Sequence, residues 1–224
     1  MRLATIAACL ALTASTAAAE SVALGGDVSR GLSPSQATCS AASYGTSWQF
    51  VVAQSYNGTE GVNPAAPVTL ANAKAAGIEV RDILHRPAVG KAPFYQVKDG
   101  IAAAGGAKNF STIWFSVDKA DHGWGPPGQA NCNVVKLLLF AAGYFQAPSG
   151  IRTTRDDWLA TAGPNCTAGK GHALWFVEHA TSGNNFTLRA PFGGWTEGIA
   201  KQYEGRHITP CGVDAEGSDS RRFA

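Results

Sequence analysis

The sequence predicts an α/β fold, a single (β/α)8 TIM-like barrel that is somewhat irregular in its second half. Short apolar or β-branched runs alternate along the chain with helix-compatible runs. The 26 Gly and 11 Pro residues punctuate these runs where tight connections are needed. Eight predicted strands over about 200 residues match the lower end of the size range of such barrels.

The first half contains the regular βα units. Ser33 and Pro34 supply an N-cap and a proline at the first position of a helix that runs toward Tyr44. Gly77 ends the second helix, and Gly105 with Gly106 ends the third. The predicted strands are Val22 to Val28, Trp48 to Gln54, Ile78 to His85 and Ile113 to Val117. The second and third helices are Asn63 to Ala76 and Pro93 to Ala104.

The second half repeats the pattern with weaker signals. A helix is predicted from about Gln129 to Tyr144, followed by a weak strand at Ile151 to Thr154 and a short helical turn around Trp158. The remaining predicted strands are Leu174 to Val177, Ile199 to Tyr203 and Gly212 to Asp214. An open doubly wound sheet is the competing architecture. It would require a Gly-rich phosphate turn after the first strand, where this chain reads SRGLSPS.

The first 19 residues have the pattern of a secretory signal peptide. Arg2 gives a positive n-region, Leu3 to Leu12 a short apolar region, and Ala17 to Ala19 a small-residue cleavage site. We therefore expect a secreted protein whose barrel domain is residues 20–224. No apolar run reaches the roughly 20 residues that a membrane span requires.

Charge and composition exclude several classes of partner. Without Arg2 the chain has 17 basic and 16 acidic residues (18 minus one against 16), which is nearly neutral. The basic residues form no cluster beyond Arg221 and Arg222, so we expect no nucleic-acid partner. The five His residues have no HExxH-type spacing, so we expect no catalytic metal. We also expect no cofactor, and a monomer.

Export also determines how the cysteines and sequons are interpreted. Cys9 leaves with the signal peptide, and the other four form an even set for which two disulfides are expected. Four cysteines allow three pairings, and the residues alone do not choose among them. The four cysteines are Cys39, Cys132, Cys166 and Cys211, and the four predicted glycosylation sequons begin at Asn57, Asn109, Asn165 and Asn185.

In a barrel, function belongs at the carboxyl ends of the strands. Neighbouring first and last strands would place Asp27 beside Asp214, with Asp118 across the mouth. Clustered carboxylates raise one another's pKa, and glycoside hydrolysis needs such a pair. Three other interpretations stay open: Asp27 as no more than a loop cap, Asp118 as no more than the partner of Lys119 in a surface ion pair, and Asp214 as no more than a loop acid. The polar residues predicted to bind substrate are Gln54, Ser116, Gln202 and Tyr203.

A tryptophan in a Gly-containing loop is the best candidate for a sugar-stacking platform. Trp195 ends the motif PFGGW, although a tryptophan there could also belong to the core.

Seven segments together resemble one family. They are GGDVS (25–29), NAKAAGI (72–78), IWFSVD (113–118), LWF (174–176), PFGGW (191–195), AKQYEG (200–205) and CGVD (211–214). In this order they resemble the glycoside hydrolase family 25 lysozymes, most closely the protist and nematode branch. The resemblance implies a β/α barrel and cleavage of the β-1,4 bond between N-acetylmuramic acid and N-acetylglucosamine in peptidoglycan.

The family's catalytic set transfers only in part. Its first-strand and last-strand aspartates match Asp27 and Asp214. Its strand-four DxE motif, which holds the general acid, matches Ser116 and Asp118. An aspartate in place of the glutamate withdraws the carboxyl by something over 1 Å, and a misplacement of that size costs on the order of 10²-fold in rate.

Two hypotheses arise from the resemblance. The first is a secreted lysozyme-like hydrolase, weakened by the altered motif, in which Asp118 is the acid. The second is a non-catalytic relative that binds a glycan or a cell-surface partner in the old cleft. Asp121 could supply a substitute carboxylate, but its direction cannot be read from DHGWGPPG. A third possibility, ranked lowest, is a different substrate, another N-acetylated polysaccharide such as chitin.

The barrel also predicts the disulfide pairing. Cys39 lies on the first helix and Cys211 leads into the eighth strand, and these elements are neighbours in a closed barrel. We therefore predict Cys39 with Cys211, which leaves Cys132 with Cys166.

Overall fold

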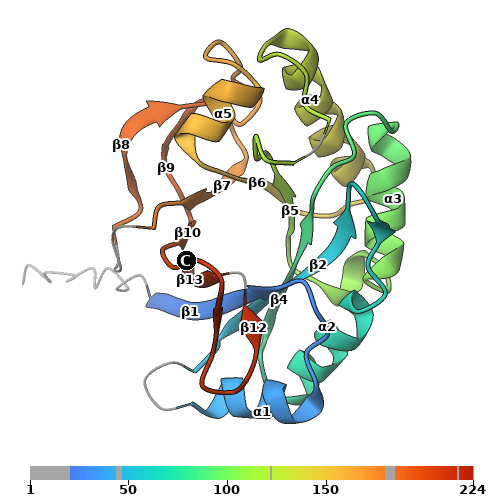
Figure 1. The fold of residues 1–224 in the computed structure, drawn as a ribbon, viewed down its shortest axis with the longest axis vertical. Helices are drawn as coiled ribbons and strands as arrows, with labels where there is room; N and C mark the ends of the chain where they lie inside the picture. Colours follow the sequence, from blue (N-terminus) through green and yellow to red (C-terminus); the bar gives the residue numbers. More distant parts are fainter. Residues whose placement is uncertain (1–20, 44–46, 122, 180–184, 216, 224) are drawn as a thin grey trace, which may run out of the picture.

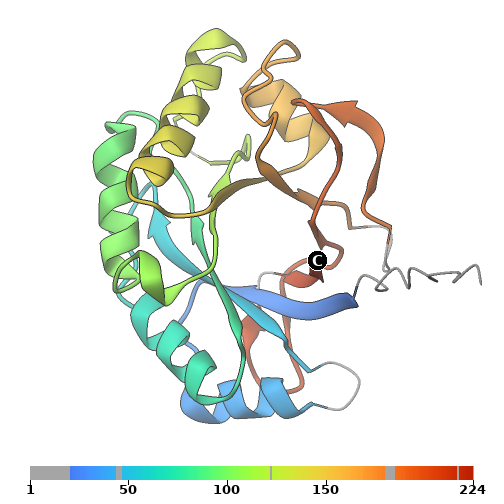
Figure 2. The ribbon, with the colours of Figure 1, turned by 180° about the vertical axis from the view of Figure 1, so that it is seen from behind.

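The fold is that of a computed structural model, which describes residues 21–43, 47–121, 123–179, 185–215 and 217–223. The predicted signal peptide, residues 1–19, lies outside the described residues. Figures 1 and 2 show the strands arranged around a central axis, with the helices on the outside.

The main sheet is curled and contains seven parallel strands. In order of pairing they are β1 (Ser21–Val28), β2 (Phe50–Asn57), β4 (Val80–His85), β5 (Ile113–Ser116), β6 (Ser149–Thr153), β7 (Ala173–Val177) and β10 (Ala200–Gln202). The short β3 (Gly61–Val62) adds to β2. A last strand, β13 (Gly217–Phe223), lies between β1 and β10 and is antiparallel to both.

The helices cover the outer face of the sheet. They are α1 (Pro34–Ala42), α2 (Ala66–Ala75), α3 (Pro93–Ala103), α4 (Gln129–Tyr144) and α5 (Arg155–Thr161), with a 3-10 turn at Ala107–Asn109. Helix α1 begins as the sequence predicts. Ser33 Oγ accepts the Gln36 amide at 3.3 Å, and the Gln36 side chain accepts the Ser33 amide at 3.0 Å, a capping box that satisfies two amides at the helix start.

The α/β class is confirmed, but a regular closed barrel of eight parallel strands is not what the structure shows. The predicted eighth strand, Gly212 to Asp214, contributes instead to β12 (Asp214–Ala215), which pairs only with β11 (His207–Ile208) among the described strands. The reason is a turn: the amide of Gly212 donates to the Thr209 carbonyl at 2.8 Å, and Gly212 has a φ of +70°. The chain therefore folds back on itself before β13 joins the main sheet.

The predicted irregularity of the second half is visible after β7. A hairpin of β8 (Thr187–Phe192) and β9 (Trp195–Glu197) stands where a regular unit would place a helix. Gly193 and Gly194, with φ of +61° and +99°, form its tip, a backbone conformation that glycine adopts without strain.

Two apolar layers hold the sheet, because successive side chains of a strand point to opposite faces. Inside the curl, Phe50, Leu84, Trp114 and Trp175 form one buried cluster. Outside it, residues such as Ile83, Phe115 and Ile151 pack against helices in a larger cluster.

Both predicted disulfides are confirmed. Cys39 on α1 is bonded to Cys211, and Cys132 on α4 to Cys166. The first links α1 to the segment before β12, so the pairing holds although that segment is not a strand of the main sheet. None of the described helices is long and apolar enough to cross a membrane.

Candidate active site

A cleft of about 820 Å³ lies at the carboxyl ends of the parallel strands. Its lining comes from the segments after β1, β2, β4 and β5, between Ser29 and Gly123. This is the end at which α/β barrels carry their active sites. The charged and amide side chains of the lining include Arg30, Gln54, Glu60, Arg86, Lys91 and Asp121.

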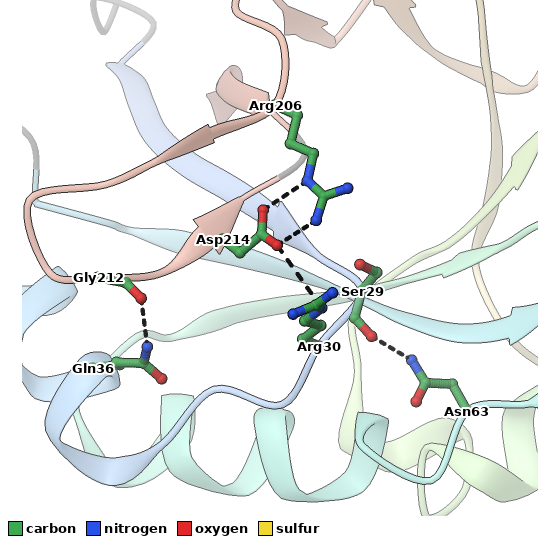
Figure 3. A network of polar contacts seen from close by, with 7 residues as sticks. All are labelled: Ser29, Arg30, Gln36, Asn63, Arg206, Gly212 and Asp214. Carbon is green, nitrogen blue, oxygen red and sulfur yellow. Dashed lines mark hydrogen bonds and ion pairs between the residues drawn. The ribbon is translucent and has the colours of Figure 1, made fainter.

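One wall of the cleft is built by β2 and the loops beside it. Gln54 projects from β2 and is 7 % exposed. Asn57 ends the strand, and its side-chain oxygen accepts the Thr59 amide at 3.1 Å, which shapes the turn before Glu60. Asn63 donates to the Ser29 carbonyl at 2.8 Å and so ties this wall to the end of β1 (Figure 3).

Another wall is the loop from Arg86 to Lys91, and Gln96 of α3 fixes it. The Gln96 amide group accepts from the Ala88 amide at 2.8 Å and donates to the carbonyls of Ala88 and Lys91 at 3.0 and 3.1 Å. His85 lies behind the loop with its Nε2 3.2 Å from Gln96 Oε1, and its ring stacks on Tyr56. Burial lowers the pKa of His85 from 6.5 to about 4, so this ring is neutral at ordinary pH.

Asp121 is the buried carboxyl of the cleft. Its side chain is 11 % exposed, and its Oδ1 lies 3.5 Å from the Arg86 guanidinium. Burial raises the pKa of Asp121 above its usual value, against the opposing effects of Arg86, Ser116 and Arg152. The negative charge of Asp118 also raises it.

Asp118 itself forms the turn that brings Asp121 into place. Its side-chain oxygen accepts the Ala120 amide at 2.8 Å, and its carbonyl accepts the Asp121 amide at 2.9 Å. The amide between them, that of Lys119, donates to Asp157 at 3.3 Å. Asp118 is half-buried and is not part of the cleft lining.

The floor beneath the strand ends is polar and closely packed. Asp27 on β1 is 1 % exposed and lies level with Val52 of β2, and Ser116 on β5 is fully buried. On the other side, Arg152 of β6 donates to the side-chain oxygen of Gln202 on β10 at 3.2 Å.

Asp214 lies within a pair of arginines (Figure 3). Arg206 donates both to Oδ1, at 2.8 Å, and to Oδ2, and Arg30 lies 3.8 Å from Oδ2. The hydrogen bond from Arg206 lowers the pKa of Asp214, and the positive charges of Arg206 and Arg30 lower it further. Arg30 belongs to the cleft lining, so its ion pair with Asp214 connects Asp214 to the edge of the cleft.

The two predicted aromatic contacts lie elsewhere. Trp195 is 6 % exposed, packs against Trp158 at 5.0 Å between ring centroids, and donates to the His172 carbonyl at 2.8 Å. Tyr203 lines a smaller hollow of about 290 Å³ beside Cys211. Of the predicted site residues, Gln54 therefore lines the large cleft, whereas Trp195, Tyr203 and the three predicted catalytic aspartates do not.

A match to a family model identifies the family. The family model described as lysozyme-like protein 1 matches residues 18–203. The chain belongs to this family.

Individual proteins agree with the family match. Lysozyme-like protein 5 of Caenorhabditis elegans is 24% identical over 175 residues, which are 75% of this chain and 79% of that protein. A muramidase from Acremonium alcalophilum has the same fold, with a TM-score of 0.71, 18% identity and coverage of 90% of this chain and 94% of the other. A family 25 lysozyme from Aspergillus fumigatus gives a TM-score of 0.66 at 16% identity, covering 91% and 95%. The resemblance to glycoside hydrolase family 25 lysozymes is confirmed.

Several cleft residues of this lysozyme-like chain were not singled out from the sequence. They are Arg30, Glu60, Arg86 and Lys91. Arg30 and Arg86 come within two residues after a strand, a position that can be recognised as a strand end. Glu60 and Lys91 lie farther along their loops, where a sequence pattern carries no such signal.

The predicted sequons have different surroundings in the structure. Asn109, Asn165 and Asn185 are exposed, whereas Asn57 lies in the cleft wall and is partly buried. Within the described residues, no group of three or more His, Cys, Asp or Glu side chains is arranged to hold a metal ion.

Proposed function

We propose that this chain is a secreted lysozyme-like protein that hydrolyses the β-1,4 bond between N-acetylmuramic acid and N-acetylglucosamine in peptidoglycan. The observation that carries the proposal is the 820 Å³ cleft at the carboxyl ends of the strands, in a member of the lysozyme-like family. The cleft combines a buried carboxyl with amide and cationic side chains. These are the groups that protonate a glycosidic oxygen and bind the polar substituents of a sugar.

Secretion is part of the same proposal. Residues 1–19 have the signal-peptide pattern, and the two disulfides are typical of proteins that fold in an oxidising compartment. Peptidoglycan, an extracellular polymer, is then within reach of the protein.

Binding without hydrolysis is the second candidate function, and one observation favours it. The two positions that match the family's DxE motif are a serine, Ser116, and an aspartate, Asp118, whose carboxylate is hydrogen-bonded within its own turn. Neither position offers a carboxyl to the cleft.

The test measures two quantities on purified peptidoglycan, the release of reducing ends and the amount of protein bound. Hydrolysis predicts release that saturates with substrate concentration. Saturable binding without release supports the second candidate, and the absence of both contradicts the use of this cleft for peptidoglycan.

A matched pair of variants connects either result to the cleft. Lys91 and Lys98 are both exposed lysines near α3, but only Lys91 lines the cleft. Replacing Lys91 by Ala removes a charged hydrogen-bond donor, so we expect binding to weaken about tenfold. Lys98→Ala should bind as the unmodified protein does, and equal effects of the two substitutions would contradict this location.

A further inference from the structure

We propose that Asp121 is the general acid of the cleft, and that the turn formed by Asp118 positions it. This inference rests on the proposed hydrolytic function. It assigns the acid to a residue three positions beyond the one that the family's motif matches.

The backbone places Asp121 in the cleft. The strand β5 ends at Ser116, and a chain that continued straight would carry Asp121 away from the strand ends. The Asp118 carbonyl instead accepts the Asp121 amide at 2.9 Å, and the Asp118 side chain holds the Ala120 amide. This Asx-type turn reverses the chain and sets Asp121 in the cleft lining, which it shares with Gln54 and Glu60.

The surroundings of Asp121 suit proton donation. Ser116 is buried nearby and lowers the pKa of Asp121, but burial of the Asp121 carboxyl has the larger effect in the opposite direction. Arg86, 3.5 Å away, orients the carboxyl from the neighbouring loop. Burial raises its pKa, which is the direction that a proton donor requires.

The two other acids near the cleft fit this role less well. Glu60 is exposed, so water surrounds its carboxylate. Asp118 is outside the lining, and its carboxylate is already a hydrogen-bond acceptor within the turn. Among the acids that the structure describes in this lining, Asp121 is the buried one.

The proton balance of the step is simple. Asp121 gives its proton to the glycosidic oxygen as the bond between that oxygen and the sugar C1 breaks, and the bonding electron pair stays on the oxygen. A water molecule then adds its oxygen to C1, and the proton that it loses returns to the Asp121 carboxylate. The net reaction consumes one water, and no oxidant, reductant or other co-reactant is needed.

Asp121→Asn is the main test, because asparagine keeps the size of the side chain and removes the proton. We expect kcat for the release of reducing ends to fall at least about 100-fold, with peptidoglycan binding retained. The exposed Asp156 on α5 supplies the matched control, since Asp156→Asn removes a carboxylate from the surface and should leave kcat unchanged. Full activity of Asp121→Asn overturns the inference while the proposed function stands.

Asp118→Asn separates positioning from catalysis. The asparagine oxygen can still accept the Ala120 amide, so this variant should lose much less activity than Asp121→Asn. A larger loss in Asp118→Asn than in Asp121→Asn would return the acid role to Asp118 and overturn the assignment.

A titration of the folded protein tests Asp121 without relying on activity. Carbon NMR of the side-chain carboxyls should show Asp121 losing its proton at a higher pH than is usual for an aspartate. In the active protein, the loss of kcat at high pH should follow the same titration. An Asp121 carboxyl that titrates at or below the usual pH for an aspartate contradicts the inference. So does an unmodified protein that binds peptidoglycan but releases no reducing ends, a result that also rejects the hydrolytic form of the proposed function.

Discussion

The two halves of the chain differ in the segments that connect the strands of the main sheet. Up to β5, helices return the chain to the next parallel strand, and the loops at the carboxyl ends line the cleft. After β7, hairpins replace helices. The polar side chains of β10 pair with other side chains: Gln202 with Arg152 of β6, and Lys201 with Glu178. Regular βα units therefore build the candidate site, whereas the irregular half supplies buried aromatic packing such as that of Trp158 and Trp195.

The largest expected effect is the loss of stability when a disulfide is removed. It should be larger for the disulfide that joins the two halves than for the one within the second half. Cys39 and Cys211 are 172 residues apart, and Cys132 and Cys166 are 34 apart. In the chain-entropy model the longer loop contributes about 5 kcal/mol and the shorter about 4 kcal/mol to the free energy of unfolding. Paired Cys→Ser variants in denaturant titrations should therefore rank in this order. A larger loss of unfolding free energy on removing Cys132–Cys166 than on removing Cys39–Cys211 would contradict this prediction.

A smaller effect concerns His85 in the first half, which stays neutral behind the cleft wall. Its pKa of about 4 in the folded protein lies below the ordinary 6.5. As the pH falls, this histidine is therefore protonated in the unfolded chain before it is protonated in the folded protein. The stabilisation is complete above pH 6.5 and is lost as the pH falls through 4, a change of roughly 3 kcal/mol. Unfolding free energies measured from pH 7 to pH 4 test it.

Two histidine variants control that measurement. His85→Phe removes the titrating group and should flatten the pH dependence, whereas His179→Phe, at an exposed position of the second half, should keep it. The partly buried His172 contributes in the same direction, because burial lowers its pKa too. Equal pH dependence in the two variants would mean that His85 is not the group responsible.

The smallest effect lies where the halves meet, at Asp214. Arg206→Gln removes the main cause of the lowered Asp214 pKa, so that pKa should rise toward its usual value. Arg189→Gln removes an exposed arginine that pairs with Glu178 and serves as the control. Carbon NMR titration of the Asp214 carboxyl measures both, and an unchanged pKa in Arg206→Gln would show that Arg30 alone sets it.

Local signals in the sequence predicted much of the fold. The Ser33 N-cap and the strand near Gln54 depend on residue types at fixed positions, and the structure has both. The disulfide pairing was predicted from the neighbouring first and last units of a barrel, and the structure has it too. The strand β13 was not predicted because its sequence, GSDSRRF, is polar, and its pairing with β1 and β10 comes from backbone hydrogen bonds that hydropathy does not record.

The candidate site was harder to predict than the fold. Trp195 sits in the glycine-rich loop that suggested a sugar platform, but the hairpin turns its indole toward Trp158, a contact set by tertiary packing. The position of Asp121 in the cleft depends on a reversal of the chain after Asp118, and no periodic pattern in the sequence predicts such a turn. Strand ends can thus be located from sequence, whereas the direction of the loops beyond them cannot.

The pairing of β1 with β13 affects the order in which the protein can be completed. Ser21 lies opposite Phe223, so one edge of β1 has no partner strand until the ribosome has made the last of these residues. Until then, that edge presents unpaired amides and carbonyls, the kind of surface on which chains associate wrongly. A partner that shields this edge during synthesis would therefore increase the yield of native protein.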